Sequence, residues 1–185
     1  MKMSIDYPRV YLSGPDIYYP NAAEIDARKK SICERFGMEG ISSYDGNSFG
    51  KFSGNKNDAL NIFRDNIKLI LSCDVLIATL NPFRGPSADV GTALEMGVMV
   101  GLERPIVAYT HDRQDYVTRL DKLYDVIEEP LSRTNGQIQT PDGVSVENFE
   151  LCDVLMVAAA ALDNAPAILD DFETAVHWAR RMVTD

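Results

Sequence analysis

The 185-residue sequence is poor in several residue types, and each shortage argues against a class of protein. It contains three cysteines, Cys33, Cys73 and Cys152, which are widely spaced and form no CxxC pair. Its two histidines, His111 and His177, lie apart from these cysteines in the sequence. A disulfide scaffold needs paired cysteines, and a structural zinc site needs clustered cysteine and histidine ligands. We therefore expect reduced thiols and no bound metal.

Basic residues are also scarce, since 18 Lys and Arg face 28 Asp and Glu and give a net charge of −10. Nucleic acid polymers and anionic membranes bind basic surfaces, so neither is expected as a partner. The longest apolar run, 154–162, is too short to span a membrane. Asp6, Pro8 and Arg9 interrupt the start of the chain before the apolar stretch of a signal peptide develops. These features predict a soluble, cytoplasmic protein.

Several motifs that mark common enzyme classes are missing. The sequence has no GxGxxG after its first apolar segment and no GxxxxGK[ST], so dinucleotide and P-loop phosphate sites are not expected. It also contains no HExxH and no GxSxG, the motifs of zinc proteases and α/β-hydrolases. The chemistry must therefore be sought in other residues.

Apolar runs alternate with amphipathic stretches along the first 110 residues. Strands are expected within 9–15, 39–43, 74–80 and 105–109, and helices at about 21–36, 57–71 and 87–101. This β-α-β-α-β-α-β order predicts an α/β fold, a doubly wound parallel sheet with helices on both faces, in a single domain 1–185. Residues 111–147 are polar and rich in turn formers, and two further helices are expected within 149–162 and 171–182.

Ligands of such sheets bind beyond the carboxyl ends of the strands. Four segments should therefore meet around one mouth: Ser13–Asp16, Tyr44–Asn47, Asn81–Asp89 and Thr110–Arg113.

Glu95 is the single charge in the apolar stretch from Val90 to Leu102. Burying a carboxylate costs several kcal/mol unless partners compensate, so a lone buried glutamate indicates function. Gly91, one turn earlier, would leave open space for a ligand before this carboxylate. The alternative is that Glu95 turns to solvent at the edge of the helix.

Two aspartates extend this pattern, and each also has a structural interpretation. Asp89 would be a helix cap, and Asp74 a turn residue that opens a buried strand. Three carboxylates and Tyr11 at one mouth fit the cleavage of a glycosidic bond, in which carboxylates act as nucleophile and proton donor.

Four segments together resemble the nucleoside 2-deoxyribosyltransferases. They are Val10–Pro15 (VYLSGP), Cys73–Ala78 (CDVLIA), Asn81–Gly85 (NPFRG) and Asp89–Gly97 (DVGTALEMG), and the last is the most specific. The resemblance implies a flavodoxin-like fold and exchange of the base on a 2′-deoxynucleoside, a reaction of nucleotide salvage. It also implies that no cofactor is needed.

The resemblance implies roles for individual residues. Glu95 matches the nucleophile that holds the deoxyribosyl group covalently, and Tyr11 matches the tyrosine that orients it. Asp74 matches an aspartate that assists the proton of the leaving base, and Asp89 matches the aspartate that recognises the sugar 5′-hydroxyl. Further substrate contacts are expected from Gly14, Pro15, Asp45, Asn47, Phe83, Gly91 and Met156.

The chain departs from the family at its C-terminal motif. The family usually has Asn-Leu-Met there, with the Asn supplied to a neighbouring subunit's site, whereas this chain has Val154-Leu155-Met156 preceded by Asp153. A homo-oligomer with sites completed across its interface is still expected. The apolar segment 154–162 and the small residues Gly97 and Gly101 favour such an assembly.

Two other functions remain open from the sequence. One is an N-glycosidase that hydrolyses a nucleoside or a nucleoside 5′-monophosphate. Related hydrolases of 5′-monophosphates carry Ser at the position of Asp89, and an aspartate there would repel a phosphate, so nucleosides are favoured. The other is a nucleotide-sensing module without catalysis. In every case the partners are small molecules.

Overall fold

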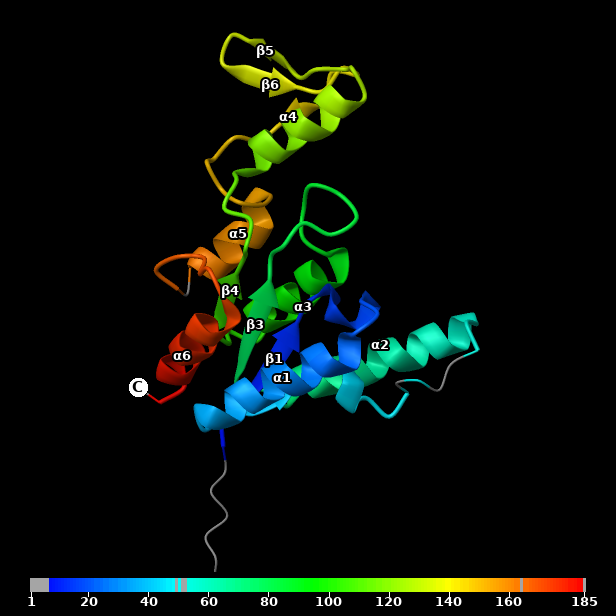
Figure 1. The fold of residues 1–185 in the computed structure, drawn as a ribbon, viewed down its shortest axis with the longest axis vertical. Coiled ribbons are helices and arrows are strands. Elements are labelled where there is room, and N and C mark those ends of the chain that lie inside the picture. Colours follow the sequence, from blue (N-terminus) through cyan, green and yellow to red (C-terminus); the bar gives the residue numbers. More distant parts are fainter. Residues whose placement is uncertain (1–6, 49, 51–52, 164, 185) are drawn as a thin grey trace, which may run out of the picture.

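The computed structural model describes residues 7–48, 50, 53–163 and 165–184, and its centre is a four-stranded parallel sheet (Figure 1). The strands are β1 (Arg9–Ser13), β2 (Glu39–Ile41), β3 (Val75–Thr79) and β4 (Ile106–Tyr109), in the order β2-β1-β3-β4. A parallel bridge between Tyr109 and Leu169 extends the sheet beyond β4. This is the flavodoxin-like strand order, and it confirms the predicted α/β class.

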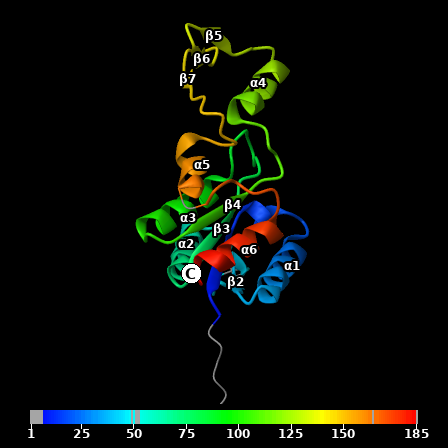
Figure 2. The same ribbon diagram turned by 90° about the vertical axis from the view of Figure 1, so that its left-hand side faces the viewer.

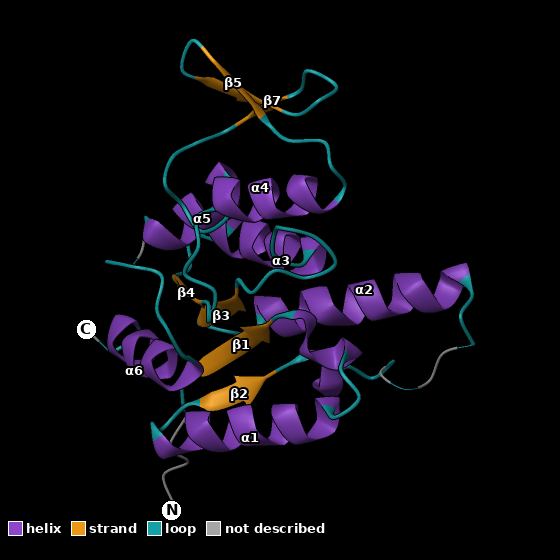
Figure 3. Cartoon of the chain, turned by 45° about the horizontal axis from the view of Figure 1, so that its top comes forward, coloured by secondary structure: helices purple, strands orange, loops and turns teal. Residues whose placement is uncertain are grey.

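Helices cover both faces of the sheet, as expected (Figures 2 and 3). One face carries α1 (Ala22–Arg35) and α6 (Phe172–Met182), and the other carries α2 (Lys56–Leu71), α3 (Val90–Gly101) and α5 (Leu155–Leu162). Short polar side chains begin most of these helices, because their oxygens accept otherwise unpaired backbone N–H groups. Such caps are Asn55 before α2, Asp89 before α3 and Asp171 before α6.

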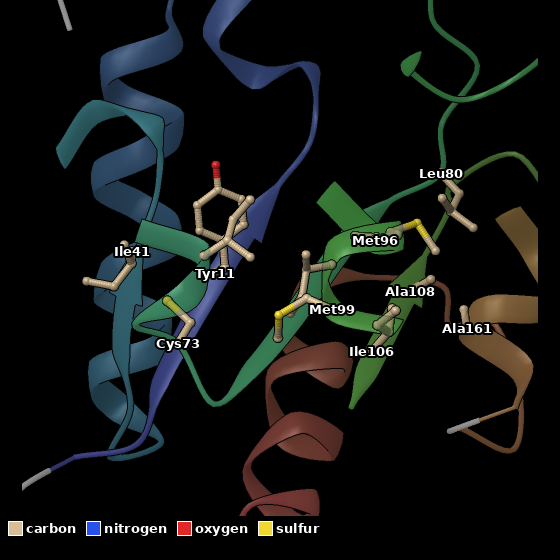
Figure 4. Close-up of a cluster of buried hydrophobic side chains, with 12 residues drawn as sticks. Tyr11, Ile41, Cys73, Leu80, Met96, Met99, Ile106, Ala108 and Ala161 are labelled. Atoms are coloured by element: carbon tan, nitrogen blue, oxygen red, sulfur yellow. The ribbon is translucent and has the colours of Figure 1, made fainter. Parts of the chain in front are cut away.

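Each face of the sheet has its own apolar core. All five residues of β3 are buried, with Val75 and Ile77 packed toward α1 and α6, and Leu76 and Ala78 toward α2 and α3. This alternation follows from the two-residue period of a strand, and burial on both faces explains the uninterrupted apolar sequence. Figure 4 shows the core under α3, where the Tyr11 hydroxyl lies at the rim of the cluster.

The polar segment 111–147 contains more secondary structure than its composition predicted. It forms α4 (Tyr116–Val126) and three short antiparallel strands, β5 (Ser132–Thr134), β6 (Gln137–Gln139) and β7 (Ser145–Val146). We call residues 116–146 the α4–β7 lobe, which extends beyond one end of the central sheet (Figures 1 and 2). The sequence did not predict α4, because the segment is rich in turn formers and the buried residues of the helix are confined to one short stretch.

The helix expected within 149–162 starts later than its apolar sequence suggests. It begins at Leu155, because the Asp153 side chain is buried and accepts the backbone N–H groups of Ala88 and Val154. Two 3₁₀ turns complete the fold, η1 (Pro15–Tyr18) after β1 and η2 (Ser43–Asp45) after β2. In the part of the chain that the structure describes, no helix is long and apolar enough to cross a membrane.

Candidate active site

The carboxyl ends of the parallel strands form one edge of the sheet, where β1 continues into η1, β2 into η2 and β3 into the β3–α3 loop (residues 80–89). Gly14 allows the ends of β1 and β3 to approach closely. A Cβ atom at Gly14 would lie 2.8 Å from the Thr79 Oγ1 atom, which is shorter than a van der Waals contact. The following Pro15 starts η1. The carboxyl ends of β1 and β3 therefore lie close together at this edge.

The Glu95 carboxylate, on α3, is held by two hydroxyl groups of β1. The Tyr11 hydroxyl donates a hydrogen bond to Glu95 Oε1 at 2.9 Å, and the Ser13 hydroxyl donates to Oε2 at 2.5 Å. Tyr11 and Ser13 are both buried, and they share one face of β1 because alternate strand residues point the same way. Both oxygens of the carboxylate are therefore oriented, and the alternative that Glu95 turns to solvent does not apply.

Burial sets the ionisation of this carboxylate. It raises the pKa of Glu95 to about 7, with a smaller contribution from the Asp89 charge, while the hydrogen bonds from Ser13 and Tyr11 oppose the rise. The pKa of the Tyr11 hydroxyl is raised by its burial and by the nearby Glu95 charge, so Tyr11 remains a proton-bearing donor. Glu95 thus changes its charge near neutral pH, which is common for functional groups.

Asp89 lies at the start of the same helix and caps it. Its Oδ2 atom accepts the backbone N–H of Thr92 at 3.1 Å. A Cβ at Gly91 would lie 2.8 Å from this oxygen. The missing side chain at Gly91 therefore makes room for the Asp89 carboxylate, whereas the sequence suggested that it makes room for a ligand. Asp89 acts as a cap and also lies close enough to influence Glu95.

Asp74 does not lie at this edge, and the prediction that it joins the other carboxylates is wrong. It precedes β3, and its Oδ2 atom accepts the backbone N–H of Arg9, the first residue of β1, at 2.8 Å. Because β1 and β3 are parallel, residues that open them lie at the amino edge of the sheet, opposite Ser13. Asp74 is therefore a structural turn residue, the other interpretation that the sequence allowed.

The remaining expected contacts come from the loops of the carboxyl edge. Asp45 ends η2, where its carboxylate accepts hydrogen bonds from the Lys30 amine and the Ser42 backbone N–H, both at 2.9 Å. Asn47 is exposed in the segment that follows. Phe83, in the β3–α3 loop, stacks on Tyr18 of η1 with ring centroids 5.4 Å apart. Among the described hydrogen bonds and ring contacts, none joins these residues to Glu95, whose partners are Tyr11 and Ser13.

Met156 faces another part of the surface. It is 80% exposed at the start of α5 and lines a mainly apolar groove of about 860 Å³ between α3 and α5. Ala93, Gly97 and Val100 of α3 line the opposite side of this groove. The structure thus places Met156 on the outer side of the helix that carries Glu95.

A cavity of about 340 Å³ lies between η1, η2 and α2. Ile17 and Tyr18 contribute from η1, and Ile62, Asp65 and Asn66 from α2. Hydrogen bonds from the Ser48 hydroxyl and backbone N–H lower the pKa of Asp65, which is therefore ionised at neutral pH. The volume falls within the usual range of small-molecule sites.

The sequence placed Ser13 near the site without predicting its hydrogen bond to Glu95, and it did not predict that Asp65 and Asn66 line a cavity. The signal for Ser13 was present, because it stands two residues after Tyr11 in a strand and must share its face. Asp65 and Asn66 lie in an amphipathic helix, where polar residues ordinarily face solvent. In the described residues, no cluster of His, Cys, Asp and Glu side chains could hold a metal ion.

Comparison with solved structures finds proteins of the same fold. A 2-desoxiribosyltransferase from Leishmania mexicana is 26% identical, with a TM-score of 0.68, over 94% of this chain and 97% of that chain. A conserved protein from Enterococcus faecalis V583 is 19% identical, with a TM-score of 0.60, over 95% of this chain and 98% of that chain, and shows the shared fold.

Comparison with known sequences identifies one curated relative and one family. An uncharacterized protein of Schizosaccharomyces pombe is 35% identical over 111 residues, which are 59% of this chain and 53% of the relative. The chain therefore spans about half the length of this curated relative. The model of the nucleoside 2-deoxyribosyltransferase family matches residues 10–156, a range that includes Tyr11, Asp89 and Glu95. The chain belongs to the nucleoside 2-deoxyribosyltransferase family.

Proposed function

We propose that this protein transfers the 2-deoxyribosyl group of a 2′-deoxynucleoside to another nucleobase, with Glu95 as nucleophile. One observation carries the proposal: both oxygens of the half-buried Glu95 carboxylate are held by hydroxyl groups at the carboxyl edge of the sheet. A pure binding module has no need of such a carboxylate, because its burial costs free energy without serving a bound neutral ligand.

The reaction divides into two displacements at the anomeric carbon, C1′. A Glu95 oxygen attacks C1′ while the bond to the base nitrogen breaks, and the bonding electrons leave with the base, which takes up a proton from water. A nitrogen of the second base then attacks C1′ from the opposite side, gives its proton to water, and releases the Glu95 carboxylate. Two inversions give net retention, and the carboxylate stabilises the positive charge that develops on the sugar.

The hydroxyl donors assist by holding the carboxylate in one orientation. Tyr11 and Ser13 donate to its two oxygens in the free protein, so the nucleophile needs no rearrangement before attack. Their hydrogen bonds also stabilise Glu95 as the leaving group of the second displacement.

We assign the base to the cavity beside η1 and α2. Asp65 is ionised there and therefore accepts hydrogen bonds from N–H groups of a base rather than supplying a proton. Asp74 cannot protonate the base, since it lies at the amino edge of the sheet. Phe83 and Tyr18 would provide an aromatic surface beside the entering base.

We assign the sugar to the region between Asp89 and Glu95. An anionic Asp89 suits the neutral 5′-hydroxyl of a nucleoside and would repel the phosphate of a 5′-monophosphate. The exposed groove at Met156 would be covered by a second copy of the chain, whose residues would complete the site across the interface.

Incubation of the protein with a 2′-deoxynucleoside, with and without a second free base, tests this function. We expect a new deoxynucleoside only when the second base is present, and a covalent mass increase of one deoxyribosyl unit on Glu95 with a slow substrate analogue. Glu95→Gln should lose at least about a thousandfold in exchange rate while keeping its fold.

Each rival function gives a different result in the same experiment. Free deoxyribose at an unchanged rate, with no new nucleoside, would identify a hydrolase. Binding without any turnover would identify a sensing module. Unchanged exchange by Glu95→Gln would exclude the proposed nucleophile.

A further inference from the structure

The β3–α3 loop carries Phe83 and ends at Asp89. Two buried charged residues from other elements form hydrogen bonds with its backbone. Arg119 comes from α4, in the α4–β7 lobe, and Asp153 comes from the segment before α5. Their side chains are 5% and 0% exposed, although Arg and Asp are rarely buried unless they are paired. Neither residue contributes to the chemistry proposed above.

The Arg119 side chain binds backbone carbonyl groups of the β3–α3 loop and of the segment before α4. Its guanidinium donates one hydrogen bond to the Pro86 carbonyl and another to the Asp112 carbonyl, both at 3.0 Å. The Nε atom also lies 3.2 Å from the Asp112 carboxylate. The planar fork of an arginine can reach these separate oxygens at once, which a lysine ammonium cannot.

Asp153 binds the same loop two residues further along. Its Oδ2 atom accepts the backbone N–H of Ala88 at 2.7 Å and lies 4.0 Å from an Arg119 nitrogen. Its Oδ1 atom accepts the N–H of Val154 at 2.8 Å. Ala88 directly precedes Asp89, so the loop is held on both sides of Ser87 just before the helix of the nucleophile begins.

We propose that Arg119 and Asp153 are positioning residues, which hold the β3–α3 loop so that Asp89 and Phe83 meet the substrate. This inference rests on the proposed function. Glu95 is held by hydrogen bonds from Tyr11 and Ser13 on β1, and these bonds do not involve residues of the loop. Loss of the pair should therefore weaken substrate binding more than it slows the chemical step.

Two conservative variants test the pair. Arg119→Lys keeps the charge but loses the fork, and Asp153→Asn keeps the shape but loses the charge. At a temperature well below unfolding, each should raise the KM for the donor deoxynucleoside by about tenfold or more and change kcat by less than about threefold. The pH at which kcat/KM is half-maximal should stay at its wild-type value, because the surroundings of Glu95 are retained.

Arg133→Lys is the matched control. Arg133 also lies in the α4–β7 lobe and pairs with an aspartate, Asp121, but its side chain is 50% exposed and contacts no residue of the β3–α3 loop among the described pairs. This variant should keep the wild-type KM. A purely structural role of Arg119 would lower the unfolding temperature without changing the KM of the folded fraction.

The outcomes separate this inference from the proposed function. If the wild type exchanges bases but folded Arg119→Lys and Asp153→Asn keep its KM, the positioning role is wrong and the function stands. If both variants are unfolded at the assay temperature, the pair supports the whole fold, and a role confined to the loop is overturned. If the wild type shows no turnover of deoxynucleosides, the function fails and the inference fails with it.

Discussion

At the scale of a single residue, Glu95 shows how a carboxylate can be held in place without being neutralised. Its partners are two hydroxyl groups, which orient the oxygens but bring no positive charge. Burial therefore dominates, and the pKa rises to about 7. A lysine or arginine partner would have stabilised the anion and lowered its nucleophilicity. Hydroxyl donors keep the carboxylate reactive at the cost of some stability.

The pH dependence of activity should follow this residue. The proposed nucleophile is the ionised form, so kcat/KM should rise about tenfold per pH unit below pH 7 and level off above it. Tyr11→Phe removes a donor to the anion and should move the half-maximal point to higher pH. Tyr124→Phe, a change in α4, is the control and should leave the profile unchanged. A midpoint near pH 4.5 in the wild type would contradict the burial argument.

The free energy of unfolding should change with pH in the direction opposite to activity, falling as the pH rises. The folded pKa of about 7 exceeds the ordinary value of 4.5, so the folded state binds the extra proton between these values. Stability contributed by Glu95 is therefore complete below pH 4.5 and is lost as the pH rises through 7. Glu95→Gln should be more stable than the wild type at pH 8, by up to about 3 kcal/mol, and the difference should shrink at pH 5. Urea unfolding at both pH values measures it, and equal stabilities at pH 8 would refute it.

At the scale of elements, the site depends on how closely the ends of β1 and β3 approach. Gly14 is extended, so its backbone conformation would accept any residue, and the constraint is the nearby Thr79 side chain. The same strand ends connect to η1 and to the β3–α3 loop, which carry Tyr18 and Phe83. A small displacement of these strand ends would therefore also move Tyr18 and Phe83.

Gly14→Ala tests this contact. The new Cβ would lie 2.8 Å from Thr79 Oγ1, so the strand ends must separate, which should cost about 1–3 kcal/mol of stability and lower kcat/KM. Gly85→Ala is the matched control in the β3–α3 loop, where no described atom lies within 4 Å of the added carbon. Thermal unfolding and exchange kinetics of both variants measure the effect. If Gly14→Ala has the stability and kcat/KM of the wild type, the close approach of the two strand ends is not required.

At the scale of the whole molecule, the groove between α3 and α5 is an unusual surface. Its exposed apolar side chains include Met156 and Val100, and large apolar patches of this kind are typical of interaction sites. The groove borders the helix that carries Glu95, so a second copy of the chain bound there would lie close to the site. This proximity supports the proposal of sites completed across an interface.

Met156→Glu should disrupt such an assembly. Met156 is 80% exposed in the single chain, so a charge there leaves the fold intact but opposes burial in an interface. Sedimentation should show an oligomer for the wild type and a smaller species with reduced exchange activity for the variant. Val126→Glu changes an equally exposed residue of α4 (81%) and should sediment like the wild type. A monomeric wild type with full activity would rule out the shared site.

Much of the central fold could be predicted because its signals are local. The buried runs of β3 and β4, and the capped helix that starts at Asp89, each occupy a short stretch with its own periodicity. Glu95 stood out for the same reason, as a charge in an apolar helix. By contrast, α4 lies in a polar, turn-rich segment whose composition conceals its short buried face.

The sequence by itself determined the order of strands along the chain, the helix that carries Glu95 and the resemblance to the family, because these depend on short patterns. Only the tertiary structure decided which distant residues meet. The Ser13 hydroxyl on β1 contacts Glu95 on α3, Arg119 and Asp153 contact the β3–α3 loop from separate elements, and Asp74 lies at the opposite edge of the sheet. The direction of parallel strands and the packing of helices set these distances, and neither is a property of any short segment.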